Sequence, residues 1–207
     1  VHGENSFQFG VEDSFNTSFG QASQRKFDAG GLRFGQTTFN LDLQRQFDLG
    51  IGNGVSFAFG AEYRDENFKI VAGEPQSWQG GPFAIANSAP AGAQVFPGFR
   101  PANEVDASRN SWAGYAEVET DLNDMLTLQF AGRYEHFSDF GGTLNGKAAA
   151  RFEPVDGLAL RGSISTGFRA PSLHQQYYAT TSTNNVNGTL VESGTFPVND
   201  PVAVALG

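Results

Sequence analysis

The chain has 207 residues, with 26 Gly, 20 Phe, no Cys and a formal net charge of −9. The lack of Cys excludes disulfide frameworks, thiolate metal sites and cysteine nucleophiles, and the acidic balance argues against a nucleic-acid partner. No apolar run approaches the ~18 to 20 residues of a membrane helix, which excludes a helical membrane protein but not a membrane barrel, whose strands give a weaker signal.

Apolar and polar residues alternate with the period of two that a strand produces, and this pattern recurs along the chain. In 38–47, for example, Phe39, Leu41 and Phe47 share one face, while Asn40 and Asp42 share the other. The predicted strands lie at about 5–13, 38–47, 55–68, 110–121, 125–137, 144–152 and 158–166. Most exceed the ~5 to 6 residues of a typical soluble strand and match the ~9 to 11 residues that cross a membrane in a barrel.

The links between these strands differ in length. Short links are expected at 48–53, 122–124 and 153–157, and long ones at 14–36, at 69–109 and after 166, with a short link at 138–143 as the exception. Membrane barrels sort short periplasmic turns from long outer loops in this way. The fold class predicted is therefore all-β, an antiparallel transmembrane β-barrel. A soluble antiparallel sheet with one solvated face also alternates and is the alternative.

Both faces of the predicted strands fit a barrel wall. The apolar face carries aromatic residues at the two expected membrane interfaces: Phe39, Tyr63, Trp112 and Tyr134 at the outer one, and Phe47 and Phe152 at the periplasmic one. The opposite face carries charged residues that we expect to line a polar lumen, because a dry core would disfavour so many ions. These are Glu62, Arg64, Glu117, Glu119, Arg133, Glu135, Lys147, Arg151 and Arg161.

Three candidate chemistries are weighed and set aside. Glu117 and Glu119 could form a glycosidase pair, but Lys and Arg on neighbouring strands favour lumen ion pairs instead. Residues 141–147 have the glycine and lysine spacing of a phosphate loop, but Ala148 stands where Ser or Thr is needed and no helix follows, so we interpret them as a turn. The histidines lack metal-ligand spacing, and we expect neither a metal nor a cofactor.

The long segment 69–109 and the tail carry the candidate ligand-binding residues. These are Trp78, Phe83, Phe96, Phe99, Arg100, Tyr177 and Tyr178. Loops this long are usually functional or disordered. Exposed aromatic rings can stack on sugars or on flat hydrophobic ligands, or they can pack the loop against its neighbours, and the sequence leaves both uses open.

Residues 161–173, R-G-S-I-S-T-G-F-R-A-P-S-L, closely resemble a signature stretch of TonB-dependent outer-membrane receptors. The segment 60–66 resembles the G-x-E-Y-R-x-E strand of that family, 131–141 resembles its A-x-R-Y-E and S-D-F-G hairpin, and 94–99 resembles a loop of one large subgroup. The resemblance runs over most of the chain in the expected order, so the combination is much more specific than any single piece.

The resemblance implies about seven consecutive strands of a 22-stranded barrel with an N-terminal plug. It implies an outer-membrane receptor of a Gram-negative bacterium that imports a ferric siderophore, cobalamin or an oligosaccharide with energy from TonB, and not an enzyme. The implied partners are outer-membrane lipid, the receptor's own plug, TonB and a small nutrient. We expect residues 1–207 to lack the plug, the TonB box and the last strands, and to aggregate alone through two unpaired strand edges. The alternatives are a soluble or surface β-rich carbohydrate-binding module and a passive porin-like barrel.

Residues Gly167, Phe168, Arg169, Ala170 and Pro171 within the signature are expected to be structural rather than to touch ligand. Gly167 would allow a conformation that a bulky residue resists, and Pro171 would end strand pairing. Arg169 would pair with a carboxylate of the loops, lumen or plug, while Phe168 and Leu173 would pack beneath it. Replacing Arg169 with Ala in the full receptor should lower folding yield more than ligand affinity.

Overall fold

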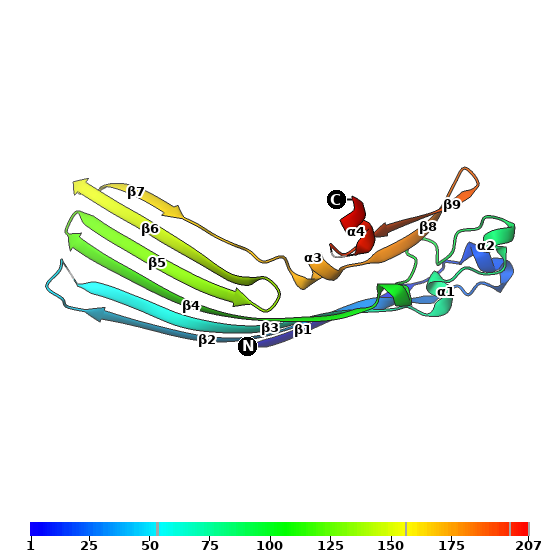
Figure 1. Ribbon diagram of the computed structural model, residues 1–207, viewed down its shortest axis with the longest axis horizontal. Coiled ribbons are helices and arrows are strands. Elements are labelled where there is room, and N and C mark those ends of the chain that lie inside the picture. Colours follow the sequence, from blue (N-terminus) through cyan, green and yellow to red (C-terminus); the bar gives the residue numbers. More distant parts are fainter. Residues whose placement is uncertain (53, 156, 199, 207) are drawn as a thin grey trace. The chain divides into compact units, whose positions relative to one another are not determined.

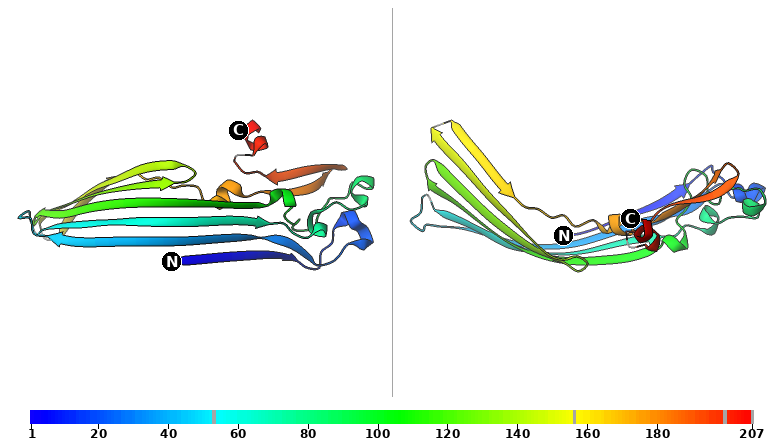
Figure 2. Two further views of the ribbon diagram at one scale, coloured as in Figure 1. Left: turned by 60° about the horizontal axis from the view of Figure 1, so that its bottom comes forward. Right: turned by 45° about the horizontal axis from the view of Figure 1, so that its top comes forward.

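The computed structural model describes residues 1–52, 54–155, 157–198 and 200–206. Its main element is a seven-stranded sheet in which the strands lie side by side in chain order, from β1 to β7 (Figures 1 and 2). The strands are β1 (His2–Val11), β2 (Phe27–Phe47), β3 (Val55–Val71), β4 (Val105–Asn123), β5 (Leu126–Phe137), β6 (Gly141–Val155) and β7 (Leu158–Ser165). All seven predicted strands are present, and no helix among the described residues is long and apolar enough to cross a membrane.

Strand β2 is much longer than predicted. It begins at Phe27, whereas the sequence placed 14–36 in a loop. The missed part contains a Gly30-Gly31 pair and no clear alternation, which weakens its strand signal. Gly30 has a φ of 88°, and a Cβ there would lie 2.3 Å from the carbonyl oxygen of Val71, so glycine is required for this close approach.

A second, two-stranded sheet was not predicted. It is the hairpin of β8 (Thr180–Val186) and β9 (Thr189–Thr195), joined by Asn187 and Gly188 with φ values of 53° and 86°. An Asn-Gly pair between two runs of strand-forming residues is the strongest short signal for a hairpin, because both turn residues need positive φ. The remaining elements are short: η1 (Thr17–Ala22), α1 (Pro75–Trp78), α2 (Phe83–Ala86), η2 (Pro101–Asn103), α3 (Leu173–Tyr177) and α4 (Pro201–Leu206).

Several predicted links were also placed wrongly. Residues 141–147, interpreted as a turn, lie within β6, and β6 continues to Val155. The link between β5 and β6 is therefore confined to 138–140. Asn53 and Asp156, which two predicted turns include, lie outside the described residues.

The chain forms two compact units. We call the first, with Val1, 37–65 and 109–170, the wall unit, and the second, with 2–36, 66–108 and the described residues from 171 on, the loop unit. Strands β2, β3 and β4 contribute residues to both units. The core of the loop unit is built around four buried side chains, those of Phe68, Ile70, Phe99 and Leu173.

The pairing register of the wall unit confirms the predicted alternation. Antiparallel pairing joins Ala116 to Gly132 and Leu128 to Ala150, and it joins Ala150 to Gly162. Even-numbered residues of β4 to β7 therefore share one face, and the odd-numbered residues share the other, because successive side chains of a strand point to opposite faces.

Candidate functional site

The apolar face of the wall unit is exposed rather than packed against another layer. Phe39 on β2 is 67% exposed, Leu144 on β6 is 77% exposed, and Ile164 on β7 is 76% exposed. Large apolar side chains on four or more neighbouring strands form a far larger patch than water-soluble monomers carry. Such a face needs an apolar solvent or partner, which a lipid bilayer provides.

Aromatic residues lie toward both ends of this face, as predicted. Phe39 and Phe47 are eight residues apart on β2, which corresponds to about 26 Å along a strand. At the end predicted to be the outer one, the Trp112 ring lies 5.4 Å from that of Tyr134 and 5.8 Å from that of His136. The apolar band of membrane barrels is about 25 Å tall and has aromatic residues at both edges.

One charged residue on the apolar face was missed by the sequence analysis. Arg45 has the same parity as Leu41, Leu43 and Phe47 on β2, and its guanidinium carbon lies 5.2 Å from the centre of the Phe47 ring. Because Arg45 is close to the turn end of the strand, its long side chain can reach the interface while its stem stays on the apolar surface. The period-two pattern itself contained this signal.

The polar face carries the charged residues predicted for the lumen, and several of them form ion pairs with each other. Arg64 Nη2 lies 2.8 Å from Glu62 Oε1, and Arg133 Nη2 lies 2.8 Å from Glu135 Oε1. Arg133 Nη2 also lies 3.6 Å from Glu62 Oε1, so the two pairs are joined across strands. Charges linked in this way remain compatible with a partly hydrated wall.

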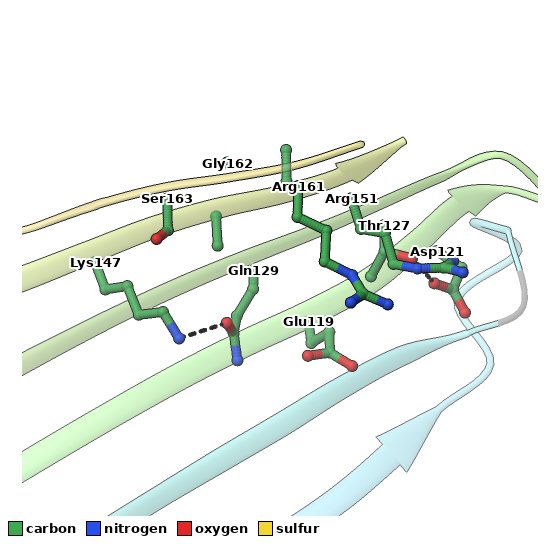
Figure 3. A pocket seen from close by; sticks show the side chains of 11 residues that line it. Glu119, Asp121, Thr127, Gln129, Lys147, Arg151, Arg161, Gly162 and Ser163 are labelled. Carbon is green, nitrogen blue, oxygen red and sulfur yellow. Dashed lines mark hydrogen bonds between the residues drawn. The ribbon is translucent and has the colours of Figure 1, made fainter. Parts of the chain in front are cut away.

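A second polar network links β4, β5 and β6. The Gln129 amide donates to Glu117 Oε1 over 2.7 Å and accepts from Lys147 Nζ over 2.8 Å. Next to it, a groove of about 540 Å³ is lined by Glu119, Lys147, Arg151 and Arg161, among others (Figure 3). Arg151 pairs with Glu153. The side chains of Glu119 and Arg161 have no hydrogen-bond or ion-pair partner within the part of the chain that the structure describes.

Tyr115 joins three strands across the same polar face. Its hydroxyl on β4 donates to Asp42 Oδ1 on β2 over 2.6 Å. The ring passes over Gly60 on β3, where an added Cβ would lie 2.6 Å from Tyr115 Cε1 and 2.5 Å from the Leu41 carbonyl oxygen. Glycine at position 60 is therefore required for this arrangement.

The structure tests two of the predictions for the segment 167–171 and leaves a third open. Gly167 does not have a positive φ, and nothing lies within 4 Å of a Cβ added to it, so no special conformation is needed there. Arg169 is exposed and has no carboxylate partner within the described residues, so its pairing with a carboxylate of the plug stays a prediction. Phe168 does pack, with its ring centre 6.1 Å from that of Phe137 and 6.5 Å from that of Phe140.

This aromatic cluster caps the short β5–β6 link. Arg109, which is 5% exposed, places its guanidinium carbon 5.5 Å from the centre of the Phe137 ring and Nη1 3.6 Å from Asp139 Oδ2. The link is thus held by a buried cation and by the ring of Phe168. These contacts explain what holds the short link that the sequence analysis identified as the exception to the alternation of loop lengths.

The candidate ligand residues of the loop unit lie in different environments. Phe99 is 1% exposed, and Phe96, Tyr177 and Tyr178 pack against the same core. The Trp78 indole N–H donates to the Gly73 carbonyl over 3.0 Å. Burial of these residues favours packing over direct ligand contact. Phe83 is the exception, because it is 43% exposed.

Arg100 fastens the β8–β9 hairpin to the segment between β3 and β4. Its Nη1 lies 2.6 Å from Glu192 Oε1, and its Nη2 donates to Thr183 Oγ1 over 2.9 Å. The Asn185 side chain adds a hydrogen bond of 2.7 Å to the Ser88 carbonyl. These contacts are polar, and they use the guanidinium of Arg100 to hold the hairpin.

A buried polar residue joins the two loops that precede β2 and β4. Asn16 is fully buried, and its amide donates to the carbonyl oxygens of Gln76 over 2.9 Å and Gln79 over 2.8 Å. Its Oδ1 accepts from the backbone N–H of Ser18 over 3.1 Å and also from the Ser18 hydroxyl. Sequence reasoning missed this residue, because partners sixty residues away leave no local signal.

Comparison with known proteins agrees with the two-faced sheet. Residues 2–199 match the family described as TonB dependent receptor-like, beta-barrel. The chain therefore belongs to the TonB-dependent receptor family, whose members are β-barrels of the Gram-negative outer membrane, and this is a family of receptors rather than of enzymes.

The chain is similar to individual proteins only at low identity or over a short segment. The chain is 32% identical over 68 residues to the iron-regulated outer membrane virulence protein of Vibrio cholerae serotype O1, from the Classical Ogawa and El Tor Inaba strains, which covers 33% of this chain and 10% of that protein. It is similar in fold to the siderophore receptor PirA from Acinetobacter baumannii, with a TM-score of 0.58, 13% identity and coverage of 95% of this chain and 27% of that one. The chain thus spans only a small part of the proteins that it matches.

Proposed function

We propose that this chain forms part of the wall and loops of an outer-membrane receptor that imports a scarce nutrient with energy from TonB. The observation that carries the proposal is the two-faced wall, with an exposed apolar face fit for lipid and a charged face fit for a hydrated lumen. Family membership supports the same role. An exposed apolar face of this size disfavours the soluble carbohydrate-binding module.

We further propose that the nutrient is a ferric siderophore. The names of two similar proteins, an iron-regulated outer membrane protein and a siderophore receptor, support this choice over cobalamin or an oligosaccharide. In this proposal, the charged residues of the polar face line the lumen around a plug domain, and residues of the loop unit meet the ligand. The role requires binding and transport but no catalysis by this chain.

Uptake by whole cells tests the proposal. Cells lacking the full-length gene would be supplied with a radiolabelled ferric catecholate, a ferric hydroxamate or cobalamin, with and without the gene restored. We expect the gene to restore uptake of a ferric chelate only when TonB is functional, while surface binding persists without TonB. Uptake that continues without TonB would instead establish a passive pore, and restoration of cobalamin uptake alone would overturn the siderophore assignment.

A further inference from the structure

Two segments of the loop unit are joined by reciprocal contacts between aromatic rings and glycines. The Phe83 ring lies against Gly20, where an added Cβ would be 2.9 Å from Phe83 Cε2. The Phe19 ring lies against Gly81 in the same way, with a distance of 2.7 Å to Phe19 Cδ2. Gly20 has φ 56° and ψ −131°, a conformation that residues with side chains rarely adopt. The two glycines therefore allow both rings to occupy these positions.

A groove lies beside this contact, between η1 and the segment that contains α2. Its volume is about 590 Å³, and its lining includes Phe19, Gln21, Phe83, Asn87 and Ala89. The volume falls within the roughly 300 to 1,000 Å³ of ligand pockets. None of the described residues that line it is ionisable, although the chain as a whole has a net charge of −9.

The polar groups of the groove are available for a ligand. The side-chain amides of Gln21 and Asn87 are exposed and have no hydrogen-bond partner among the described residues. Each amide offers two donor hydrogens and one acceptor oxygen. Thr17 is already used, because its hydroxyl donates to the Pro90 carbonyl over 3.0 Å and so holds η1 in place. Phe83 stays 43% exposed and presents ring surface to the groove.

We propose that this groove binds a neutral saccharide of one or two rings. The C–H groups of a pyranose carry a partial positive charge and are attracted to the negative face of an aromatic ring. Amides that both donate and accept suit hydroxyl groups, which do the same. The uncharged lining offers no ion pair to an anionic iron chelate, so this site is separate from the proposed import function and does not depend on it.

The test uses the full-length protein in a detergent without a sugar headgroup, with glucose, galactose and maltose as probes. Saturation-transfer NMR should show contact with the C–H groups of at least one of these sugars. Replacing Phe83 with Ala should lower the affinity for that sugar by about tenfold, because both stacking and apolar contact are lost. The double variant Gln21→Ala/Asn87→Ala should lower the same affinity by a similar factor.

Matched variants keep the result interpretable. Phe15 is also an exposed phenylalanine, 45% exposed, and it lies in the β1–β2 link that contains η1, but it does not line the groove, so Phe15→Ala should leave sugar binding unchanged. Gly20→Ala should abolish binding by displacing the Phe83 ring. The proposal is overturned if no probe sugar binds, if Phe83→Ala and Phe15→Ala behave alike, or if only a flat apolar probe such as naphthol binds. Iron-chelate uptake is measured separately, so its failure would not be mistaken for failure of this site.

Discussion

The fully buried Asn16 should hold the loops before β2 and β4 together, and replacing it with Ala should release them. The change would leave the carbonyls of Gln76 and Gln79 and the N–H of Ser18 without a partner. Each buried unsatisfied group costs about 1 to 3 kcal/mol. If water reaches some of these groups after relaxation, the free energy of local opening falls by about 3 kcal/mol. This corresponds to an increase of about 100-fold in the equilibrium constant for local opening.

Hydrogen exchange measured by mass spectrometry on the full-length protein in nanodiscs is the suitable assay. Peptides that cover 14–24 and 74–79 should exchange about 100-fold faster in Asn16→Ala, because exchange follows the local opening equilibrium. Asn16→Asp should have a larger effect, because its carboxylate would face two carbonyl oxygens. The exposed Asn5 provides the control, and Asn5→Ala should change nothing. Exchange in Asn16→Ala that matches this control would refute the role of the buried network.

Three further predictions concern other contacts. Leu43→Arg, at the middle of the apolar face, should lower the free energy of unfolding in vesicles by about 2 to 4 kcal/mol, measured by urea titration. Arg100→Glu and Glu192→Arg should each increase the mobility of a spin label on the β8–β9 hairpin by about fivefold, and the factor is modest because Glu192 is 63% exposed. The double exchange should restore the original mobility. Gly60→Ala should destabilise the wall by about 1 to 3 kcal/mol through the clash with Tyr115, seen as a lower temperature of gel-shift unfolding.

Controls for these variants come from the same strands. Gln44→Arg places the same charge beside Leu43 but on the polar face, and it should change the free energy of unfolding little. A loss equal to that of Leu43→Arg would contradict the assignment of the two faces. Gly132 has nothing within 4 Å of an added Cβ, so Gly132→Ala should be tolerated. If it destabilises as much as Gly60→Ala, the loss is not due to contact with Tyr115. A double exchange at Arg100 and Glu192 that fails to restore mobility would show that the ion pair does not hold the hairpin.

The wall was predictable because one of its faces is apolar and the other is polar. A strand with two such faces must alternate, so the residues from Thr38 to Phe47 indicate both the strand and which side chains share a face. The same rule would have placed Arg45 on the apolar face. The start of β2 was hidden because Gly30 and Gly31 weaken alternation, and its pairing depends on contacts made after folding.

The loop unit was harder to predict because its contacts join distant parts of the chain. Nothing near Asn16 in sequence indicates its bonds to Gln76 and Gln79. The aromatic residues of 69–109 could equally have bound ligand or packed, and only burial separates Phe99 from Phe83. The β8–β9 hairpin was different, because the Asn187-Gly188 pair is a local signal for such a turn and the sequence analysis did not use it.

Spin-label accessibility along β2 tests the two-faced wall most directly. The chain contains no Cys, so single cysteines can be introduced from 38 to 47 without background labelling within it. In the full-length protein in vesicles, labels at odd positions such as Leu41 and Leu43 should be reached by oxygen dissolved in lipid. Labels at even positions such as Asp42 and Gln44 should not be, and should be reached by water-soluble nickel chelates where the lumen is open. Oxygen accessibility that shows no period of two would contradict the account of this chain as a membrane wall.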